Sequence, residues 1–240
     1  MQIIDANTIF GPCPRTTADI SIDRLVAATK SHGVAKSLTL STLGIFHSYA
    51  DGNKETTSQC QGKPELLPAA TIDPRGYFPG MKLISALISQ GFRLFRFFPG
   101  EQDWPLDHAV FEDILNELEP TAVPVMINAG CTGDASALGR TLGGKQHPLI
   151  LEGVVFETLA EAVSVMKKHG NIFVETHGLT APGALRFLVE QVGADRIIFG
   201  SDCPRSSLAG ALRYIQESGI SDQDKEHVLG GSIIRLLGGS

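Results

Sequence analysis

Short apolar runs of five or six residues alternate along this chain with longer segments in which apolar residues recur every three or four positions. The first pattern is typical of buried strands and the second of amphipathic helices. Strands are therefore predicted over residues 2–6, 35–40, 67–72, 92–97, 124–128, 149–153, 172–176 and 196–200. Between them, helices are indicated by spacings such as that of Phe111, Ile114, Leu115 and Leu118.

Eight alternating units of this kind predict an α/β protein with a (β/α)8 TIM barrel. An open doubly wound sheet is less favoured, because no Gly-rich phosphate turn follows the first strand. The length of 240 residues suits one barrel, so a single domain over residues 1–240 is expected. The weakly patterned stretch 47–64 is expected to be partly helical. The glycine pairs 143–144 and 230–231 follow helical stretches and indicate C-caps.

Composition narrows the class of protein. Hydrophobic residues make up 42% and charged residues 19% of the chain, as in a globular protein with a sizeable core. With a net charge of -6 and no basic run longer than Lys167-Lys168, we expect no nucleic-acid partner. No stretch reaches the ~18 apolar residues of a membrane span, so we expect no membrane partner. The cysteines, which show no C-x-x-C spacing, indicate reduced thiols and a cytoplasmic location; they are Cys13, Cys60, Cys131 and Cys203.

Polar side chains finish several of the predicted strands. Residues two apart on a strand share a face, so Ile3, Asp5, Asn7 and Ile9 are expected on one face of the first strand. The same parity on the other strands predicts a polar layer at the carboxyl-end mouth of the barrel, where TIM barrels place their sites. The members of this layer are Asp5, Asn7, Arg96, Asn128, Glu175, His177 and Asp202, and Glu152 is a further candidate.

Three members of this layer have structural alternatives to a functional role. Asp5 is either a site carboxylate or a buried group bonded to backbone amides or to Arg96. Asn128 either contacts a ligand or satisfies backbone groups of its own loop. Arg96 stands among phenylalanines, where an unpaired charge is costly, and must therefore meet an anion. We favour a ligand carboxylate or phosphate over a protein carboxylate.

Asp202 is the strongest catalytic candidate, because it follows a buried strand directly. A role in capping the next helix is its alternative. His177 is either a site residue or a hydrogen-bonded loop histidine. A covalent mechanism has little support, since there is no Gly-x-Ser-x-Gly elbow and a carboxylate beside Cys203 makes that thiol less reactive.

These segments resemble the amidohydrolase-related TIM-barrel family, a group of predicted metal-dependent hydrolases that includes relatives of aminocarboxymuconate-semialdehyde decarboxylase. The most specific matches are Arg196-Ile197-Ile198-Phe199-Gly200-Ser201-Asp202-Cys203-Pro204 and the closing stretch from Leu229-Gly230-Gly231-Ser232 to Leu237-Gly238. The resemblance implies a (β/α)8 barrel, a hydrolase or related lyase activity, and a homo-oligomer.

In that family the first strand ends in Asp-x-His-x-His, whose histidines bind a divalent metal. Histidines after the fifth and sixth strands and an aspartate after the eighth complete the site. The corresponding positions here are Asn7, Ile9, Asn128, Gly153 (or Glu152 with a one-residue shift) and Asp202. Only Asp202 matches, and an amide or an isoleucine cannot replace imidazole on zinc. The resemblance therefore implies that the usual zinc site cannot assemble.

Three interpretations follow. Magnesium or manganese could be held at a non-standard site by Asp202, Glu175, His177 or Glu152, which offer mainly oxygen ligands. Alternatively the site works without metal, with Asp202 as general base and Arg96 holding a substrate carboxylate. In the third interpretation the barrel is catalytically silent and binds a small anion or a protein partner.

The working hypothesis is a hydrolase, or related lyase, that acts on a small carboxylated substrate with a degenerate or metal-free site. Asp202 and His177 are its catalytic candidates. The substrate-binding candidates are Asn7, Arg96, Asn128, Glu152 and Glu175.

Overall fold

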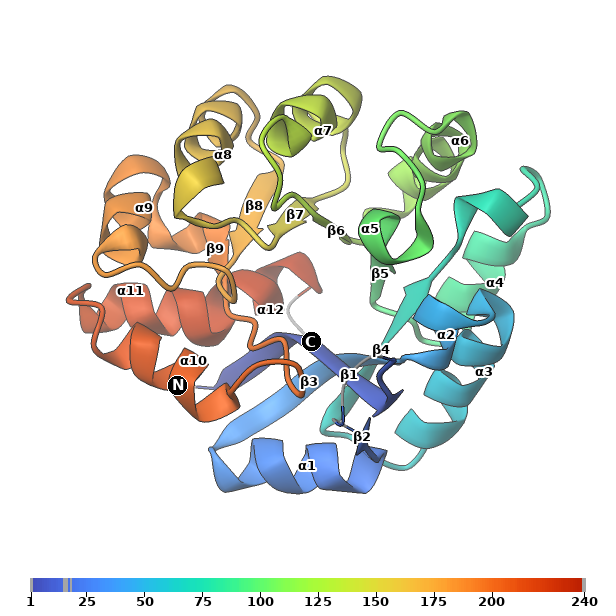
Figure 1. Ribbon diagram of the computed structural model, residues 1–240, viewed down its shortest axis with the longest axis horizontal. Helices are drawn as coiled ribbons and strands as arrows, with labels where there is room; N and C mark the ends of the chain where they lie inside the picture. The colour runs from blue at the N-terminus through green and yellow to red at the C-terminus, as the bar shows by residue number, and fades with distance from the viewer. Residues whose placement is uncertain (1, 15–16, 18, 239–240) are drawn as a thin grey trace.

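The structure, a computed structural model, describes residues 2–14, 17 and 19–238. Parallel strands form a central ring with helices around it (Figure 1). The parallel strands are β1 (Ile3–Pro12), β3 (Val34–Ser41), β4 (Leu66–Thr71), β5 (Leu94–Phe97), β6 (Val125–Asn128), β7 (Leu149–Glu152), β8 (Ile172–Glu175) and β9 (Ile197–Ile198). All eight predicted strands are thus confirmed.

The strands pair in chain order, β1-β3-β4-β5-β6-β7-β8-β9, and every one of these pairs is parallel. The ring closes between β1 and the chain after β9: the Ala6 amide donates to the Phe199 carbonyl and the Ile9 amide to the Cys203 carbonyl, both at 3.0 Å. A short strand, β2 (Asp19–Ile20), pairs antiparallel with the end of β1. The predicted single-domain (β/α)8 barrel is therefore confirmed.

Helices cover the outside of the ring and its two ends. They are α1 (Ile22–Ser31), α2 (Leu43–Phe46), α3 (Tyr49–Cys60), α4 (Leu83–Ser89), α5 (Pro99–Gln102), α6 (Ala109–Leu118), α7 (Asp134–Leu142), α8 (Phe156–Lys168), α9 (Ala184–Val192), α10 (Leu208–Gln216), α11 (Asp222–Glu226) and α12 (Ser232–Leu236). Short 3-10 turns are η1 (Pro74–Gly76), η2 (Glu119–Thr121) and η3 (Ala194–Arg196), and η4 (His227–Gly231) is a π-helical turn. The expected helix within 47–64 is α3. Among the described helices, none has the length and hydropathy needed to cross a membrane.

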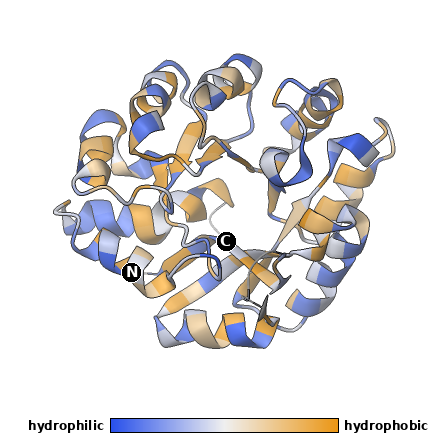
Figure 2. Ribbon diagram, in the orientation of Figure 1, coloured by the Kyte–Doolittle hydropathy of each residue, from blue (hydrophilic) through white to orange (hydrophobic). Residues whose placement is uncertain are grey.

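Two apolar layers hold the barrel together. The inner layer comes from alternate strand positions, including Leu38, Leu94, Met126 and Ile150. The outer layer joins the opposite strand faces to the helices, as Phe97 does against Phe111 of α6. The strands are accordingly apolar on both faces, and the helices alternate between apolar and polar stretches (Figure 2). This leaves the strand ends as the place where polar side chains can gather.

The prediction that Ile3, Asp5, Asn7 and Ile9 share one face of the first strand is partly wrong. Irregular register between Ile3 and Ile4 and between Asp5 and Thr8 interrupts the simple alternation. Ile4 and Ile9 pack in the inner layer, whereas Ile3 packs against the outer one. A β-bulge of this kind shifts side chains between faces, so Asp5 and Asn7 have different surroundings.

The C-terminal helices pack against the ring and fix β1. Ile233 of α12 joins the inner layer beside Ile4 and Ile198. The Phe199 amide donates to the Val228 carbonyl at 2.9 Å. A Cβ on Gly230 would lie 2.0 Å from the Gln2 carbonyl oxygen, so this glycine permits a close backbone approach. The C-cap predicted for 230–231 is therefore wrong, because both glycines lie in continuous helical turns; Gly143, by contrast, is the C-cap of α7.

Candidate functional site

The Asp5 carboxylate stabilises the closure of the ring. Its Oδ1 accepts hydrogen bonds from the backbone amides of Asn7 and Ser201, both at 3.0 Å, and its Oδ2 accepts one from the Ser201 hydroxyl at 2.5 Å. Complete burial raises the pKa of Asp5 to about 7, although these hydrogen bonds act to lower it. Of the alternatives for Asp5, the bonds to backbone amides are observed, and its side-chain partner is Ser201.

Four of the predicted residues meet at the carboxyl ends of β1, β7 and β8. The Asn7 Nδ2 lies 3.3 Å from Glu152 Oε1 and 3.4 Å from Glu175 Oε2. The same nitrogen lies 3.3 Å from His177 Nδ1. Asn7, Glu152 and Glu175 are almost completely buried, and His177 is partly exposed. An amide that faces two carboxylates must present its NH2 group to them, so Asn7 acts here as a donor.

His177 and Glu175 form a close pair. The imidazole Nδ1 donates to Glu175 Oε2 at 2.5 Å, and the backbone amide of His177 donates to Glu175 Oε1 at 2.8 Å. Burial by itself lowers the pKa of His177, but the charge and hydrogen bond of Glu175, together with the charges of Glu152 and Asp202, outweigh it and the pKa rises to about 9. The imidazole is therefore protonated at neutral pH, and its Nε2 has no protein partner among the described residues.

Arg96 is completely buried and joins three strands. Its Nη2 donates to Glu152 Oε1 of β7 at 3.0 Å, and its Nη1 donates to the Thr8 carbonyl of β1 at 3.3 Å. Its guanidinium also stacks over Phe98, 5.2 Å from the ring centroid. Burial raises the pKa of Glu152, but Arg96, His177 and Arg205 outweigh it and the net direction is downward. The anion that meets Arg96 is thus a protein carboxylate, the alternative that we favoured less.

Asp202 reaches this cluster through Arg205, a residue that sequence reasoning missed. Arg205 Nη2 lies 2.7 Å from Asp202 Oδ1 and 3.8 Å from Glu152 Oε1. Its Nη1 donates to Glu101 of α5 at 3.0 Å. Burial lowers the pKa of Arg205, but these three carboxylates raise it above its usual value. The sequence did offer one indication of this role, because Arg205 follows the candidate Asp202 by three residues in the same loop.

Asp202 itself adopts a left-handed backbone conformation, with φ 56°. The Arg205 contacts involve Oδ1, and Oδ2 has no protein partner among the residues described. The following helix, α10, is capped by Ser207 and not by the Asp202 side chain. Backbone strain at a non-glycine residue is often found at functional positions.

Asn128 does not hydrogen-bond to the cluster. Its side chain is exposed, and its Oδ1 accepts a bond from the Gly130 amide at 3.0 Å. A Cβ on Gly153, the residue after β7, would lie 2.6 Å from the Asn128 Nδ2, so this amide occupies the space that a side chain at position 153 would need. The loop-satisfying alternative describes its observed contacts, and its role in substrate binding stays a prediction.

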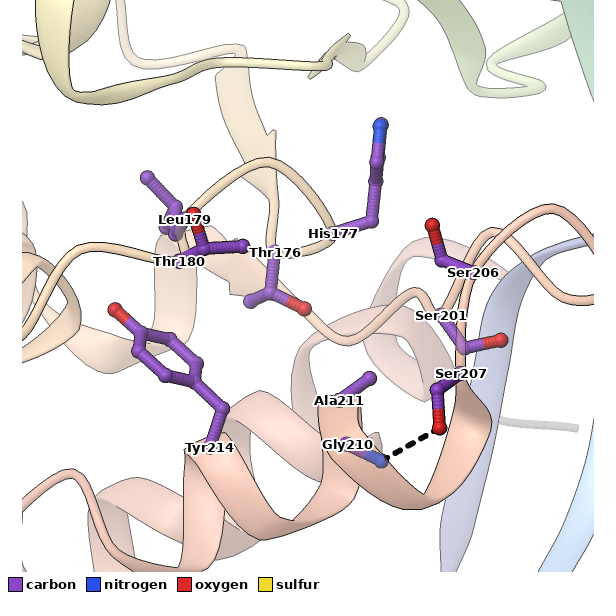
Figure 3. A pocket seen from close by; sticks show the side chains of 10 residues that line it. All are labelled: Thr176, His177, Leu179, Thr180, Ser201, Ser206, Ser207, Gly210, Ala211 and Tyr214. Carbon is purple, nitrogen blue, oxygen red and sulfur yellow. Dashed lines mark hydrogen bonds between the residues drawn. The ribbon is translucent and has the colours of Figure 1, made fainter.

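Two cavities open beside the cluster. One of about 370 Å³ lies between the loop after β8 and the first turns of α10, and His177 is in its lining (Figure 3). The other, of about 350 Å³, lies among α2, η1 and α5 and is lined by His47, Arg75 and Glu101 among others. Within the described part of the chain, no group of three or more His, Cys, Asp or Glu residues is arranged to hold a metal ion.

The fold and this cluster define a (β/α)8 barrel with a charged site at the carboxyl ends of its strands. The family model for amidohydrolases matches residues 142–239, which include β7, β8, β9, Asp202 and the closing helices. The resemblance to the amidohydrolase-related TIM-barrel family is thus confirmed. No curated protein matches the chain.

Solved structures with the same fold cover nearly the whole chain. One is an uncharacterized TIM-barrel protein from Bordetella bronchiseptica, 16% identical, with coverage of 99% of both chains and a TM-score of 0.79. Another is a putative 2-pyrone-4,6-dicarboxylic acid hydrolase from Pseudomonas putida, 17% identical over 99% of this chain and 97% of that one, with a TM-score of 0.78. The third is 5-carboxyvanillate decarboxylase from Novosphingobium aromaticivorans, complexed with manganese and 4-hydroxy-3-methoxy-5-nitrobenzoic acid, 14% identical over 99% and 96%, with a TM-score of 0.78.

Proposed function

We propose that this protein is a metal-independent hydrolase of the amidohydrolase superfamily that acts on a small carboxylated substrate. One observation carries the proposal. Asp202 and His177 each have one polar atom fixed by a protein partner and a second atom without one, at the mouth of the barrel. A fixed base and a fixed acid that both retain a free atom are what addition of water to an acyl group requires.

The donor set does not fit the divalent ion of the family. Ile9 lies in the apolar inner layer, and Asn7 presents its NH2 group to two carboxylates. Glu152 and Asp202 are each paired with a guanidinium, so cations of the protein stand beside the oxygens that a metal would need. Replacing those ion pairs with metal contacts would leave buried Arg96 without its anion, which is costly.

The proposed chemistry is hydrolysis of an ester or lactone. Asp202 Oδ2 takes a proton from water, and the water oxygen forms a bond to the carbonyl carbon. The bond from that carbon to the leaving oxygen then breaks, and the leaving oxygen receives the proton of His177 Nε2. Transfer of the proton on Asp202 to the imidazole, through water, restores both groups. Glu175 orients the imidazole and stabilises its charged form, as a third group does in other acid–base assemblies.

Arg205 and His177 support the proposal of a carboxylated substrate. Both are cations at the mouth with some solvent exposure, whereas Arg96 is completely enclosed. We assign to Arg96 the positioning of Glu152, and to Arg205 and His177 the attraction of a substrate anion. Two of the solved structures named above agree with this substrate class, since one name is that of a dicarboxylic acid hydrolase and the other structure holds a nitrobenzoic acid.

The test is a panel of carboxylated lactones, esters and β-keto acids assayed with wild-type protein and two variants. Asp202→Asn is expected to lower kcat by about 10²–10⁴-fold, the usual contribution of a general base. Asp222→Asn, an exposed carboxylate on α11, is the matched control and should leave turnover unchanged. Full activity of Asp202→Asn would rule out the assigned base.

The same panel separates the non-enzymatic alternative. Arg205 contacts three carboxylates at once, an arrangement that also suits a barrel that only binds an anion. That alternative predicts no turnover of any panel compound by the wild-type protein, together with saturable anion binding that Arg205→Met removes.

A further inference from the structure

The cavity beside His177 has a lining that the catalytic cluster does not explain. It lies between the loop that follows β8 and helix α10, and the chain between β9 and α10 supplies the rest of its wall (Figure 3). His177 belongs to both the cavity lining and the cluster, so the cavity adjoins the proposed catalytic site. Its volume of about 370 Å³ is within the range of small-molecule sites.

The hydroxyl groups of the cavity fall into two sets. Thr176, Ser201 and Tyr214 already hydrogen-bond within the protein; the Tyr214 hydroxyl, for example, donates to the Ala181 carbonyl at 3.1 Å. Thr180 and Ser206 have no side-chain partner among the described residues. In the view of Figure 3 they lie on opposite sides of His177. The second set is therefore available to a ligand.

Ser207 adds a further donor. Its Oγ accepts a hydrogen bond from the Gly210 amide at 3.2 Å, and its O–H remains free to donate. No Asp or Glu is among the lining residues. Donors without a competing carboxylate favour a bound oxyanion over a cation, because each donor then meets an acceptor lone pair.

The remaining wall is apolar and made of small residues. Leu179 is buried, and Gly210 and Ala211 leave room on the face of α10 that lines the cavity. A larger side chain at Ala211 would take up that room. The cavity thus combines a polar end suited to a carboxylate with an apolar part suited to a compact body such as one ring.

We propose that this cavity is a substrate subsite beside His177 that binds the carboxylate of a small, ring-sized acid through Thr180, Ser206 and Ser207, with its body against Leu179 and Ala211. The proposal rests on the proposed function in that the bound acid is a substrate or product of the same site. It adds the place and the donors that recognise the carboxylate.

The experiment measures binding of benzoate, and of benzamide as its neutral isostere, by two-dimensional NMR titration. Ala211→Leu fills the cavity and is expected to weaken benzoate binding by at least about tenfold. Ala209→Leu is the matched control, because it places the same side chain on an exposed position of α10 outside the cavity lining. Thr180→Val removes one donor without changing shape and should weaken binding by about 5–10-fold.

The outcomes separate this subsite from the proposed reaction. Benzoate that binds wild type and Ala209→Leu alike, but not Ala211→Leu, supports the subsite even if no panel compound is turned over. Absence of saturable benzoate binding, equal affinity for benzamide, or unchanged binding by Ala211→Leu overturns it. In that case a loss of turnover in Asp202→Asn would leave the proposed reaction standing.

Discussion

The charge on His177 links the site to the stability of the fold. Its folded pKa of about 9 lies above the ordinary value of 6.5, because the charge and hydrogen bond of Glu175, with the charges of Glu152 and Asp202, outweigh the effect of burial. The pair therefore contributes its full stability below about pH 6.5, and this contribution is lost as the pH rises through about 9. A shift of this size corresponds to about 3 kcal/mol.

We therefore expect His177→Gln to flatten the fall in unfolding free energy between pH 6.5 and 9.5. Urea unfolding at several pH values measures this, with His32→Gln, an exposed histidine after α1, as the control. Identical pH profiles for wild type and His177→Gln would contradict the assigned pair.

Asp5 gives a second pH dependence, in a lower window. Burial raises its folded pKa to about 7 from an ordinary value of 3.8. Because the folded protein holds this proton more tightly, the contribution is complete below about pH 3.8 and is lost as the pH rises towards 7.

Asp5→Asn keeps an acceptor for the Asn7 and Ser201 amides and removes the titration. As the pH rises from 4 to 7, the free energy of unfolding of this variant should fall by a few kcal/mol less than that of wild type. Calorimetry across that range tests it, and a parallel profile would show that Asp5 does not titrate as inferred.

At the residue scale, the sequence predicted side chains that leave strand ends but not those supplied by loops. Strand parity correctly predicted that Glu175 and His177 lie close together, because β8 is regular as far as Glu175. It failed for Asp5, because the irregular register of β1 turned that carboxylate towards Ser201. Arg205 was missed because it lies in a loop, and strand parity carries no information there.

Among the elements, the buried ion pair of Arg96 and Glu152 ties β5 to β7, and the Thr8 carbonyl ties β5 to β1. Glu152→Gln removes one partner and leaves a buried guanidinium without its anion, which is expected to cost about 3–5 kcal/mol. The double variant Arg96→Met with Glu152→Leu should lose less than the sum of the single variants, because no isolated charge remains. Denaturant unfolding of Arg96→Met, Glu152→Leu and the double variant decides this, and strictly additive losses would argue against the pair.

The π-helical turn η4 depends on one glycine. A Cβ on Gly230 would clash with the Gln2 carbonyl at 2.0 Å, whereas one on Gly231 would meet its nearest atom at 3.4 Å. Gly230→Ala should therefore destabilise the protein by about 1–3 kcal/mol as β1 or η4 shifts. The matched control Gly231→Ala should be close to neutral. Thermal unfolding compares them, and equal melting temperatures would show that β1 does not depend on this approach.

At the element scale, every predicted strand is present, because each is an apolar run in a sheet that is buried on both faces. The C-cap predicted at Gly230 was wrong, and the neighbouring residues in the sequence could not have shown why. The glycine is needed where it meets Gln2, at the other end of the chain. Contacts between distant segments decide such positions.

For the molecule as a whole, the barrel gathers a group of charged side chains at one end and pairs them with one another. The carboxylates Glu101, Glu152, Glu175 and Asp202 stand against Arg96, Arg205 and protonated His177. In the family that this chain resembles, a divalent ion supplies positive charge at this end. In our proposal side chains of the protein supply it here, and this substitution is the basis of the proposed metal-independent reaction.

Metal content tests this claim most directly. The protein is purified without chelator, equilibrated with manganese and zinc, desalted, and analysed by inductively coupled plasma mass spectrometry. Our account predicts that neither metal is retained in stoichiometric amount, because the positive charges of Arg96 and Arg205 stand beside Glu152 and Asp202. One manganese or zinc ion retained per chain would contradict it.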